Sequence, residues 1–393
     1  NPQLKMARIL LFVIACTRAC FAMLANQQAG ARSRQNIPQQ RPFARACVLP
    51  SRARRVHLVQ AVASTSIDDV EVFLRSKSGQ VEAAPLVSAL CSACKDIALQ
   101  VRTASCDSTA CFNDFGDEQL AVDMLAEEAL LGALESSGEH VLVSSMLEQA
   151  LTVFGRNGAA VGEEAEAEAK FSVAIDSLDG VSIVDTNFAV GTLFSVWRAP
   201  SVLNVTGRDL VAAGACSYGP RTSLYLALAD REDVHEFLLV GSEADGVTGR
   251  GRWARSNTFA GICDGKLFAP GNLRAAASNP DYASLVKYWQ DNRYQLRYTG
   301  GMVMDVLQLL IKGKGVFVTP ASVGERPRHH LLYEAVPLAY LIEKCGGASS
   351  DGECSLLDVT VHSLDQRTQI AMGSASEVRR FDETIGPAPS PAA

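Results

Sequence analysis

The sequence predicts a layered fold of α-helices and β-strands, arranged as two packed halves. The chain has 393 residues, which is too long for one small core and suits two halves packed together. From residue 171 onward, short apolar runs are separated by Gly, Asp and Asn, a pattern typical of β-strands. The last third alternates helix-like and strand-like segments, as layered α/β proteins do.

Apolar residues at helical spacing dominate the part before residue 140. Residues 66–103 predict two helices, and "EQLAVDMLAEEALLGALESS" predicts another. A polar loop at 103–119 separates them, and the strand "EHVLVSS" follows. The acidic segment 155–170 predicts a solvated surface loop.

The part after residue 170 predicts strands and helices in turn. The expected strands are "FSVAID", "AVGTLFSVW", "TSLYLALA", "HEFLLVG", "GVFVTP" and "TQIAMGS". The expected helices lie near 280–290, at 302–312 and at 333–345.

Composition and charge exclude some classes of partner. Hydrophobic residues make up 48% of the chain and charged residues 20%, which is an ordinary globular balance. The net charge is −7, so nucleic acid is not an expected partner. A phosphorylated substrate would need a local basic patch.

The first 60 residues differ in composition from the rest. Lys5 and Arg8 flank the apolar run 9–25, which is short for a membrane span and typical of a signal peptide. Residues 30–58 carry seven arginines and no acidic residue, which resembles a plastid or mitochondrial transit peptide. A disordered basic arm is the alternative. We expect residues 1–65 to be a disordered signal plus transit peptide, with no membrane segment in the mature form.

The C-terminal end also differs. The run "GPAPSPAA" is rich in Pro and Ala, so we expect residues 384–393 to be a disordered tail.

The stretch "FSVAIDSLDGVSIVDTNFAVG" ends an apolar strand on two carboxylates, Asp176 and Asp179. Gly180 permits unusual backbone angles, so both carboxylates and the Leu178 carbonyl can point into one site. Such oxygen ligands suit Mg²⁺. The turn would also leave backbone N–H groups for a phosphate, those of Gly180, Val181 and Ser182. A plain turn without a metal is the alternative.

The chain has eleven cysteines, with two local pairs, Cys91/Cys94 and Cys106/Cys111. No second CxxC or His pair completes a zinc site, so we reject zinc. Cys91 and Cys94 lie in a helical stretch and are expected on one apolar helix face.

The D-x-L-D-G turn and its flanks resemble the fructose-1,6-bisphosphatase/sedoheptulose-1,7-bisphosphatase family. Other blocks resemble this family in the same order, namely "GDEQLAVDMLA", "VTGRDLVAAGACSYGPRTSLYLAL", "GKLFAPGNLRA", "RYTGGMV" and "LLYEAVPLAYLIEKCGG". The runs "SIVDTNF" and "APGNLR" are similar to the sedoheptulose branch. The resemblance implies a sugar-phosphatase fold, an αβαβα sandwich. We expect residues 66–200 to carry the metal site and redox loop, and 201–383 to form the substrate half.

The resemblance implies a Mg²⁺-dependent sugar-bisphosphate 1-phosphatase, a phosphoric monoester hydrolase of the Calvin cycle. In this family metal-bound water attacks the 1-phosphate while Mg²⁺ stabilises the phosphoryl charge. The implied metal ligands are Asp176, the carbonyl of Leu178, Asp179 and Glu334. The implied catalytic acids are Asp117 and Asp123.

Asp117 and Asp123 are six residues apart. On one helix they would face directions about 120° apart at ~3.6 residues per turn, so they share a site only if Asp117 precedes the helix. A helix N-cap is the alternative role for Asp117.

The resemblance also implies substrate contacts. The matching positions are Asp179, Gly180, Val181, Ser182, Asn272, Arg297, Tyr298 and Arg328. Met302 and Asp305 match family residues near the sugar. From the residues alone, Arg297 could equally be a surface charge and Tyr298 a half-buried packing residue.

The chain departs from the family most clearly after its first short strand. Ser145 and Met146 stand where the family has two adjacent glutamates, and neither is a strong Mg²⁺ ligand. Glu148 is the nearest acid and would need a shifted loop. Smaller departures are Ser177 for proline, Val181 for serine, and Arg328 and His330 for Lys and Arg.

These departures leave several interpretations open. The chain is either a working sedoheptulose or fructose bisphosphatase with a weakened metal site, or a catalytically inactive homologue that keeps the fold and sugar-phosphate binding. A fructose-specific enzyme or a monophosphatase of the wider superfamily remains as a further alternative.

Cys106 and Cys111 lie just before Asp117. In the plastid branch a pair at matching positions is reduced by thioredoxin, and the resemblance implies the same here. A disulfide would restrain the segment that must bring Asp117 to the metals. Two unpaired loop thiols are the alternative. The resemblance further implies a homodimer, and the two-part leader indicates the chloroplast stroma.

Overall fold

The computed structural model describes residues 69–75, 83–103, 111–112, 118–119, 121–155, 169–241, 251–321 and 326–388. All of them belong to the larger of two compact units, Cys47–Ala393. The expected leader, Cys106 and Asp117 lie outside the described residues, as does most of the expected acidic loop.

An eight-stranded sheet runs in the order β10-β9-β8-β7-β6-β5-β3-β4. Its strands are β3 Val141–Ser145, β4 Leu151–Phe154, β5 Phe171–Asp179, β6 Val190–Trp197, β7 Leu210–Tyr218, β8 Thr222–Leu228, β9 Val234–Val240 and β10 Arg252–Phe259. Neighbours are antiparallel except β3 and β5, which are parallel and pair Ser145 with Ile175. The C-terminal ends of β3 and β5 therefore lie side by side at one edge.

A five-stranded sheet runs in the order β12-β11-β13-β17-β15. Its strands are β11 Cys263–Pro270, β12 Gln295–Leu296, β13 Lys314–Thr319, β15 Ala348–Ser350 and β17 Ile370–Gly373. The chain also forms two small pairs, β1 Cys111–Phe112 with β2 Glu118–Gln119, and β14 His329–His330 with β16 Arg367–Thr368.

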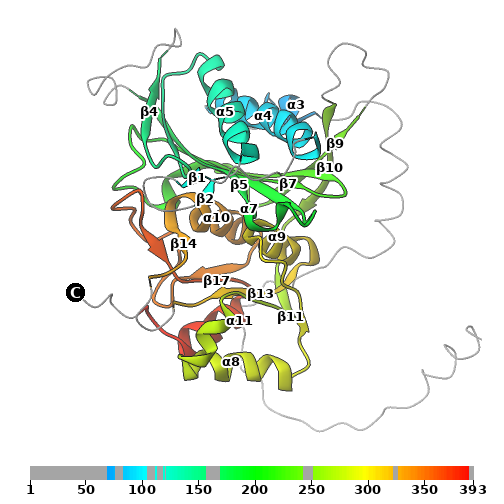
Figure 1. Ribbon diagram of the computed structural model, residues 1–393, viewed down its shortest axis with the longest axis vertical. Helices are drawn as coiled ribbons and strands as arrows, with labels where there is room; N and C mark the ends of the chain where they lie inside the picture. The colour runs from blue at the N-terminus through cyan, green and yellow to red at the C-terminus, as the bar shows by residue number, and fades with distance from the viewer. Residues whose placement is uncertain are drawn as a thin grey trace, which may run out of the picture. The chain divides into compact units, whose positions relative to one another are not determined.

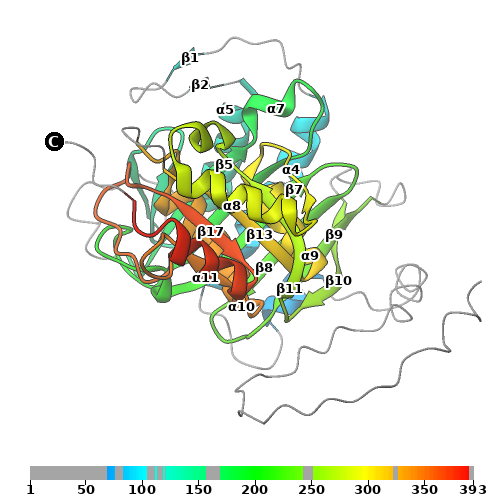
Figure 2. The same ribbon diagram turned by 90° about the horizontal axis from the view of Figure 1, so that it is seen from below.

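The helices form three layers around the two sheets (Figure 1). The outer layer on the eight-stranded sheet contains α3 Val70–Arg75, α4 Ala84–Thr103 and α5 Ala121–Ser136. Between the sheets lie α9 Met302–Lys312 and α10 Val336–Lys344. Figure 2 shows the last layer, α8 Pro280–Asp291 and α11 Ala375–Thr384, in front of the five-stranded sheet. This order of layers confirms the expected αβαβα sandwich.

Short helical turns complete the chain. They are α7 Val181–Val184, the 3₁₀ turns η2 Gly207–Asp209 and η3 Leu273–Ala277, and the π-helical turn η4 Leu331–Ala335.

Buried apolar side chains form three clusters between these layers. One joins α3, α4 and α5 to the eight-stranded sheet, with Leu90 and Phe194 among its members. A second surrounds α9 and α10 between the sheets and includes Leu309 and Leu341. A third packs α8 and α11 on the five-stranded sheet through Trp289 and Phe381. Burial of such faces is the main favourable term in folding, so the layers position the site.

The sequence boundaries of α9 were predicted closely. Gly301 precedes it, and Gly313 ends it in the left-handed conformation at φ 64°, which glycine adopts without steric cost. The helix expected at 333–345 begins instead as the π turn η4, and α10 starts at Val336.

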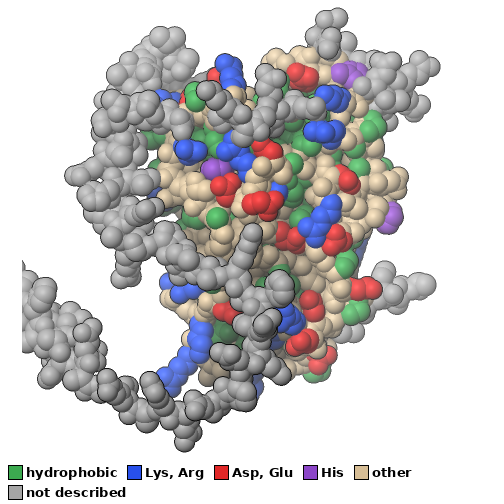
Figure 3. Space-filling view, turned by 180° about the vertical axis from the view of Figure 1, so that it is seen from behind, with side chains coloured by type: hydrophobic (Ala, Val, Ile, Leu, Met, Phe, Trp, Pro, Cys, Tyr) green, Lys and Arg blue, Asp and Glu red, His purple; other side chains and the backbone are tan. Residues whose placement is uncertain are grey.

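The expected division at residue 200 falls between β6 and β7, which pair in one sheet. The chain passes from the eight-stranded to the five-stranded sheet between β10 and β11. The face in Figure 3 shows acidic and basic side chains interspersed.

Among the described helices, α4 is long and apolar enough to cross a membrane. However, Leu86, Leu90 and Ile97 of this helix belong to the core beneath the outer layer. Such burial is typical of a helix in a protein core, which passes the same test of length and composition.

Candidate active site

Three carboxylates converge at the edge where β5 ends. Asp176 and Asp179 come from β5, and Glu334 comes from the π turn η4. One oxygen from each lies within 4.8 Å of the others. Residues 155 positions apart in the chain (334 − 179) thus meet in one group, as the family resemblance implied.

Asp179 is held by the start of α9. The backbone N–H of Val303 donates to Asp179 Oδ2 at 2.7 Å. The register between β5 and β6 shifts between Asp176 and Asp179. This irregularity lets both carboxylates approach Glu334, although a regular strand would separate them along its length.

Glu334 is fixed by two neighbouring histidines. His329 Nδ1 lies 2.7 Å from Glu334 Oε1, and the backbone N–H of His330 donates to Oε2 at 2.6 Å. The turn itself is tied to β3, because the hydroxyls of Ser144 and Tyr333 lie 2.8 Å apart. Burial would raise the pKa of Glu334, but the attraction of His329 and these hydrogen bonds lower it to about 2.

Within this group of carboxylates, the negative charge of Asp176 is not balanced by a positive charge among the described residues. Burial, followed by the charges of Asp179, Glu334 and Asp123, raises the pKa of Asp176. Burial also raises the pKa of Asp179, to about 6. Asp176 Oδ2 has no hydrogen-bond partner among the described residues. Buried carboxylates need a counter-charge, and an all-oxygen set fits a hard divalent cation.

Helix α5 brings two further buried acids to the same edge. Ser177 Oγ donates to Asp123 Oδ1 at 2.7 Å. One turn later, Glu127 accepts a hydrogen bond from the Ser145 side chain. Burial raises the pKa of Asp123 to about 6 and that of Glu127 to about 7.

The turn after Asp179 has the expected backbone. Gly180 adopts φ 91° and ψ 22° and precedes the short helix α7. Any side chain there would be strained, and its Cβ would lie 3.3 Å from Val190 Cγ1. The first N–H groups of a helix have no intrahelical partner, so we expect those of Val181 and Ser182 to be available to a phosphate. This phosphate contact stays a prediction.

A basic cavity of about 310 Å³ lies where β11 and β13 end and β14 and β16 begin. Its lining includes Asn272, Arg274, Arg326, Arg328 and Arg367. A second cavity of about 250 Å³ shares Asn272, Arg274 and Arg328 and adds Tyr298. Together these residues offer several positive charges to an anion.

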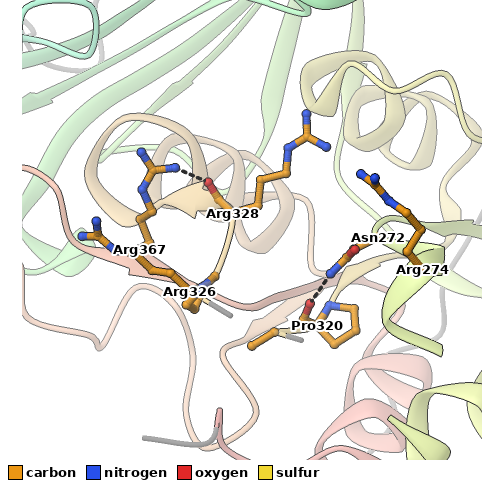
Figure 4. A pocket seen from close by; sticks show the side chains of 8 residues that line it. Asn272, Arg274, Pro320, Arg326, Arg328 and Arg367 are labelled. Carbon is orange, nitrogen blue, oxygen red and sulfur yellow. Dashed lines mark hydrogen bonds between the residues drawn. The ribbon is translucent and has the colours of Figure 1, made fainter. Parts of the chain in front are cut away.

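Figure 4 shows how the lining is arranged. Asn272 Nδ2 donates to the carbonyl of Pro320 at 3.3 Å, and Arg367 donates to the carbonyl of Arg328 at 2.7 Å. Arg326 is neutralised by Asp365, to which Arg367 also bonds. Arg274 and Arg328 extend into the same region from different segments, and they are the charges best placed for a phosphate.

Tyr298 lines the second cavity and is affected by the charge of one of the three carboxylates. Burial raises its pKa, the charges of Asp305 and Asp179 raise it further, and Arg328 opposes them. The Tyr298 side chain is 44% exposed. It therefore stands within electrostatic reach of both regions and remains accessible to a ligand.

Comparisons with known proteins identify the family. A model of the fructose-1-6-bisphosphatase N-terminal domain matches residues 68–246, and a model of its C-terminal domain matches residues 263–386. This chain belongs to the fructose-1,6-bisphosphatase family. Chloroplastic sedoheptulose-1,7-bisphosphatase from Triticum aestivum is 46% identical over 318 residues, which are 81% of this chain and 77% of that protein.

Two further relatives agree. The Spinacia oleracea protein of the same name is 45% identical over 81% of this chain and 78% of its own length. A crystal structure described as a sedoheptulose-1,7 bisphosphatase from Toxoplasma gondii has a TM-score of 0.71 and 32% identity, covering 81% of this chain and 98% of the other. The fold class and the family expected from the sequence are therefore confirmed.

The remaining predicted residues of this fructose-1,6-bisphosphatase family member occupy varied positions. Arg297 is exposed and lines neither cavity. Asp305 is fully buried and accepts hydrogen bonds from the backbone N–H groups of Thr299 and Gly300. It thus shapes the loop that carries Tyr298. Met302 is also buried.

The residues at the departures from the family pattern are placed as follows. Ser145 lies at the end of β3, beside Ile175, and the Met146 N–H donates to the Ile175 carbonyl at 2.9 Å. Glu148 is exposed, and its charge adds to the raised pKa of Glu127. The ring of His330 is buried and lines neither cavity.

Helix α5 begins at Ala121, so position 117 precedes it, which is the condition for Asp117 and Asp123 to share a site. The backbone N–H of Leu178 donates to the Asp176 carboxylate, and a contact of the Leu178 carbonyl with a metal stays a prediction.

Sequence reasoning missed Glu127, His329 and Arg274. A signal existed for Glu127, because it follows Asp123 by four positions and so shares its helix face. Arg274 lies two residues after Asn272 in a turn. His329 carried no signal, since its contact with Glu334 depends on the π turn.

Proposed function

We propose that this chain hydrolyses the 1-phosphate of sedoheptulose 1,7-bisphosphate in a Mg²⁺-dependent reaction of the Calvin cycle. The observation that supports this most is the carboxylate group of Asp176, Asp179 and Glu334, together with a basic cavity lined by Tyr298, on whose pKa the charge of Asp179 acts. A bisphosphate needs such an arrangement, with one end at a cation site and the other at positive charges. The plant relatives carry this substrate in their names.

We assign phosphate binding, sugar contact and cation binding to different residues of the chain. Arg328 and Arg274 bind the distant phosphate, and Tyr298 and Asn272 contact the sugar. Asp176, Asp179 and Glu334 would hold Mg²⁺, which when bound supplies charge that stabilises the transferring phosphoryl group. Catalysis of this kind is mainly positioning and electrostatics.

Asp123 is suited to accept a proton from the attacking water. Its pKa is raised to about 6 by burial, which places it near the working range of a general base. Ser177 holds one of its oxygens, so the carboxylate keeps a single orientation. Asp117 is proposed as the second acid of this step.

One observation favours a second candidate, a catalytically inactive homologue that retains sugar-phosphate binding. Ser145 and Met146 contribute no charge at the end of β3, and His329 already binds Glu334. Fewer cation ligands lower the occupancy of such a site. Fructose 1,6-bisphosphate is the alternative substrate.

The cellular setting belongs to the same proposal. Residues 1–65 act as a two-part leader to the chloroplast stroma, in keeping with the chloroplastic relatives. Thioredoxin reduces a Cys106–Cys111 disulfide, and two chains form a homodimer. Residues 384–393 are a tail outside the folded part.

The test is phosphate release from both bisphosphates by the purified, reduced protein, with Mg²⁺ and with EDTA. We expect phosphate release from sedoheptulose 1,7-bisphosphate in the presence of Mg²⁺ and none in EDTA. Asp179→Asn should abolish it, whereas Asp185→Asn, at a nearby exposed position, should not. Tight substrate binding without turnover would favour the inactive homologue, and neither binding nor turnover would refute both.

A further inference from the structure

The loop between β6 and β7 contains the tripeptide Asn204-Val205-Thr206. Asparagine two residues before serine or threonine, with any residue except proline between them, is the acceptor motif for N-linked glycosylation. The sequence contains this motif once. Because so short a motif also arises by chance, its position in the fold decides whether a glycan fits there.

Asn204 lies on the surface, where a glycan needs its acceptor to be. It is exposed and adopts a left-handed backbone conformation, with φ 59°. Its backbone N–H donates to the carbonyl of Val361 at 2.7 Å, and the N–H of Val361 donates to the carbonyl of Val205 at 3.0 Å. Both contacts use backbone atoms, so they anchor the loop without occupying the Asn204 amide. A sugar on this amide would leave both hydrogen bonds intact.

The loop leaves the eight-stranded sheet at the end opposite the carboxylate group. Ser172, near the start of β5, pairs with Trp197 of β6. The hydroxyl of Ser172 also donates to the carbonyl of Ser201 in the loop at 3.0 Å. Asp179 lies seven residues farther along β5 (179 − 172), which corresponds to roughly 20 Å at about 3.3 Å per residue. A glycan on this loop is therefore attached away from the carboxylates.

Both residues of the motif also have explanations within the fold. Asparagine is one of the residues that adopt left-handed turns most readily. The Thr206 hydroxyl caps η2, since it donates to Asp209 Oδ2 at 2.9 Å and accepts from the Arg208 N–H at 3.3 Å. These contacts form in the folded chain, whereas the transferase acts on the chain as it is made. A structural role alone predicts no modification, so the two explanations are separable by experiment.

We propose that Asn204 is a site of N-linked glycosylation, used while the chain passes through the secretory pathway. This inference rests on the proposed leader, whose apolar run 9–25 is typical of a signal peptide. It goes beyond the proposed hydrolysis, because the glycan takes no part in that reaction. Its consequence is a mark on the protein, since only chains that reach the plastid through the secretory pathway meet the transferase.

The donor is an oligosaccharide linked to a lipid through a diphosphate. The Asn204 Nδ2 atom forms a bond to C1 of the first sugar as the C1–O bond to the diphosphate breaks. The amide releases one proton to a base of the transferase, and the lipid diphosphate leaves with the electron pair of the broken bond. The product carries a bulky, polar group on the surface.

The experiment translates the full chain in vitro with endoplasmic-reticulum microsomes and measures its gel mobility before and after digestion with peptide N-glycosidase F. The wild type is compared with Asn204→Gln and Asn187→Gln. Asn187 is the matched control, because it is also exposed and left-handed, with φ 62°, but is followed two residues later by Ala189. We expect one glycan on the wild type and on Asn187→Gln, and none on Asn204→Gln.

Changes at Thr206 and Ala189 separate the motif from the turn. Thr206→Ser keeps a hydroxyl and should keep the glycan, whereas Thr206→Ala should lose it. Ala189→Thr gives Asn187 the acceptor motif and should add a second glycan. Because the transfer precedes folding, these results do not depend on how well each variant folds.

An unglycosylated wild type inside the microsomes would overturn the inference, and a glycan on Ala189→Thr would show that the transferase was active and passed over Asn204. A chain that stays outside the microsomes would refute the signal-peptide part of the leader, and the glycan with it. Neither result affects the proposed hydrolysis, which phosphate release tests. A glycosylated protein that releases no phosphate would refute the hydrolysis and keep this inference.

Discussion

His329 Nδ1 lies 2.7 Å from Glu334 Oε1, within the group of carboxylates expected to hold a cation. Both side chains are nearly buried, with exposed fractions of 14% and 10%. The histidine thus contacts the oxygen that a cation would use. It either orients Glu334 for the cation or competes with the cation for Glu334, and these two roles predict opposite effects of removing it.

We expect competition to dominate, so His329→Leu should raise Mg²⁺ affinity. A hydrogen bond to a charged group contributes about 1.5–3 kcal/mol. Removing the hydrogen bond between His329 and Glu334 should therefore raise the Mg²⁺ affinity about tenfold. Calorimetric titration with Mg²⁺ measures this. His362→Leu, at an exposed position, is the control. Weaker Mg²⁺ binding in His329→Leu would show that the imidazole orients Glu334 instead.

The acids of the site also predict how stability changes with pH. Folding raises the pKa of Asp123 and Asp179 from 3.8 to about 6 and that of Glu127 from 4.5 to about 7. The folded state therefore holds more protons than the unfolded state between about pH 4 and pH 7, and its stability falls as the pH rises through this window.

We expect the free energy of unfolding in EDTA to fall from pH 4 to pH 7, and saturating Mg²⁺ to reduce this fall. Urea unfolding at several pH values, with and without Mg²⁺, measures the effect. Glu334, whose pKa is lowered to about 2, acts in the opposite direction and only below about pH 4.5. A flat profile in EDTA would contradict the burial of these acids.

The basic cavity predicts a loss of substrate affinity. Arg328→Gln removes a charge that lines both cavities, and we expect KM for the bisphosphate to rise about tenfold or more, since a charge-assisted contact contributes about 1.5–3 kcal/mol. The effect on kcat should be smaller, because the distant phosphate does not react. Arg379→Gln, exposed on α11, is the control. An equal loss in both variants would contradict the assignment.

Local pattern predicted the elements well where one residue type decides the boundary. The glycines around α9 are an example, whereas β5 continues to Asp179, three residues past the expected end of that strand at Asp176. The π turn η4 was missed, because apolar periodicity does not distinguish it from the start of α10. The strands β4, β7, β10 and β11 were also missed; of these, the edge strand β10 carries exposed polar residues that interrupt an apolar pattern.

The site was predicted in part for a similar reason. Asp176 and Asp179 are visible locally, as carboxylates at a strand end, and Glu334 entered only through the family resemblance. Contacts across elements, such as Glu127 with Ser145 and His329 with Glu334, depend on side-chain packing that no spacing in the sequence encodes. The residues whose contacts lie on another element, such as Glu127 and His329, were therefore the ones missed.

Redox control predicts a dependence on two cysteines. Reduction should raise activity, and Cys106→Ser or Cys111→Ser should make activity insensitive to reduction. The backbone of Cys111 pairs with Gln119 just before α5, so a disulfide there would restrain the approach to Asp123. The measurement is phosphate release with oxidised and reduced thioredoxin.

Cys91 and Cys216 are poor candidates for this response. Burial raises the pKa of Cys91 and Cys216 well above the ordinary value, which makes them unreactive. Cys354 is free and exposed, so Cys354→Ser is the control. A wild-type redox response in both loop variants would place the switch elsewhere.

Restoring the two acids at the end of β3 tests how far the site is weakened. Ser145→Glu with Met146→Glu adds carboxylates beside Glu127 and Asp176, so the protein without Mg²⁺ should become less stable while its Mg²⁺ affinity rises. Better cation binding should increase turnover. A hundredfold gain would correspond to about 2.7 kcal/mol of transition-state stabilisation. Initial rates of phosphate release over a range of Mg²⁺ concentrations measure both effects.

The double variant also distinguishes the candidate functions. If the wild type already shows high turnover at ordinary Mg²⁺ and the variant adds nothing, then Glu148 or another acid completes the cation site. If the variant binds Mg²⁺ tightly but remains inert, the defect lies outside the cation ligands, and the inactive homologue becomes the better description.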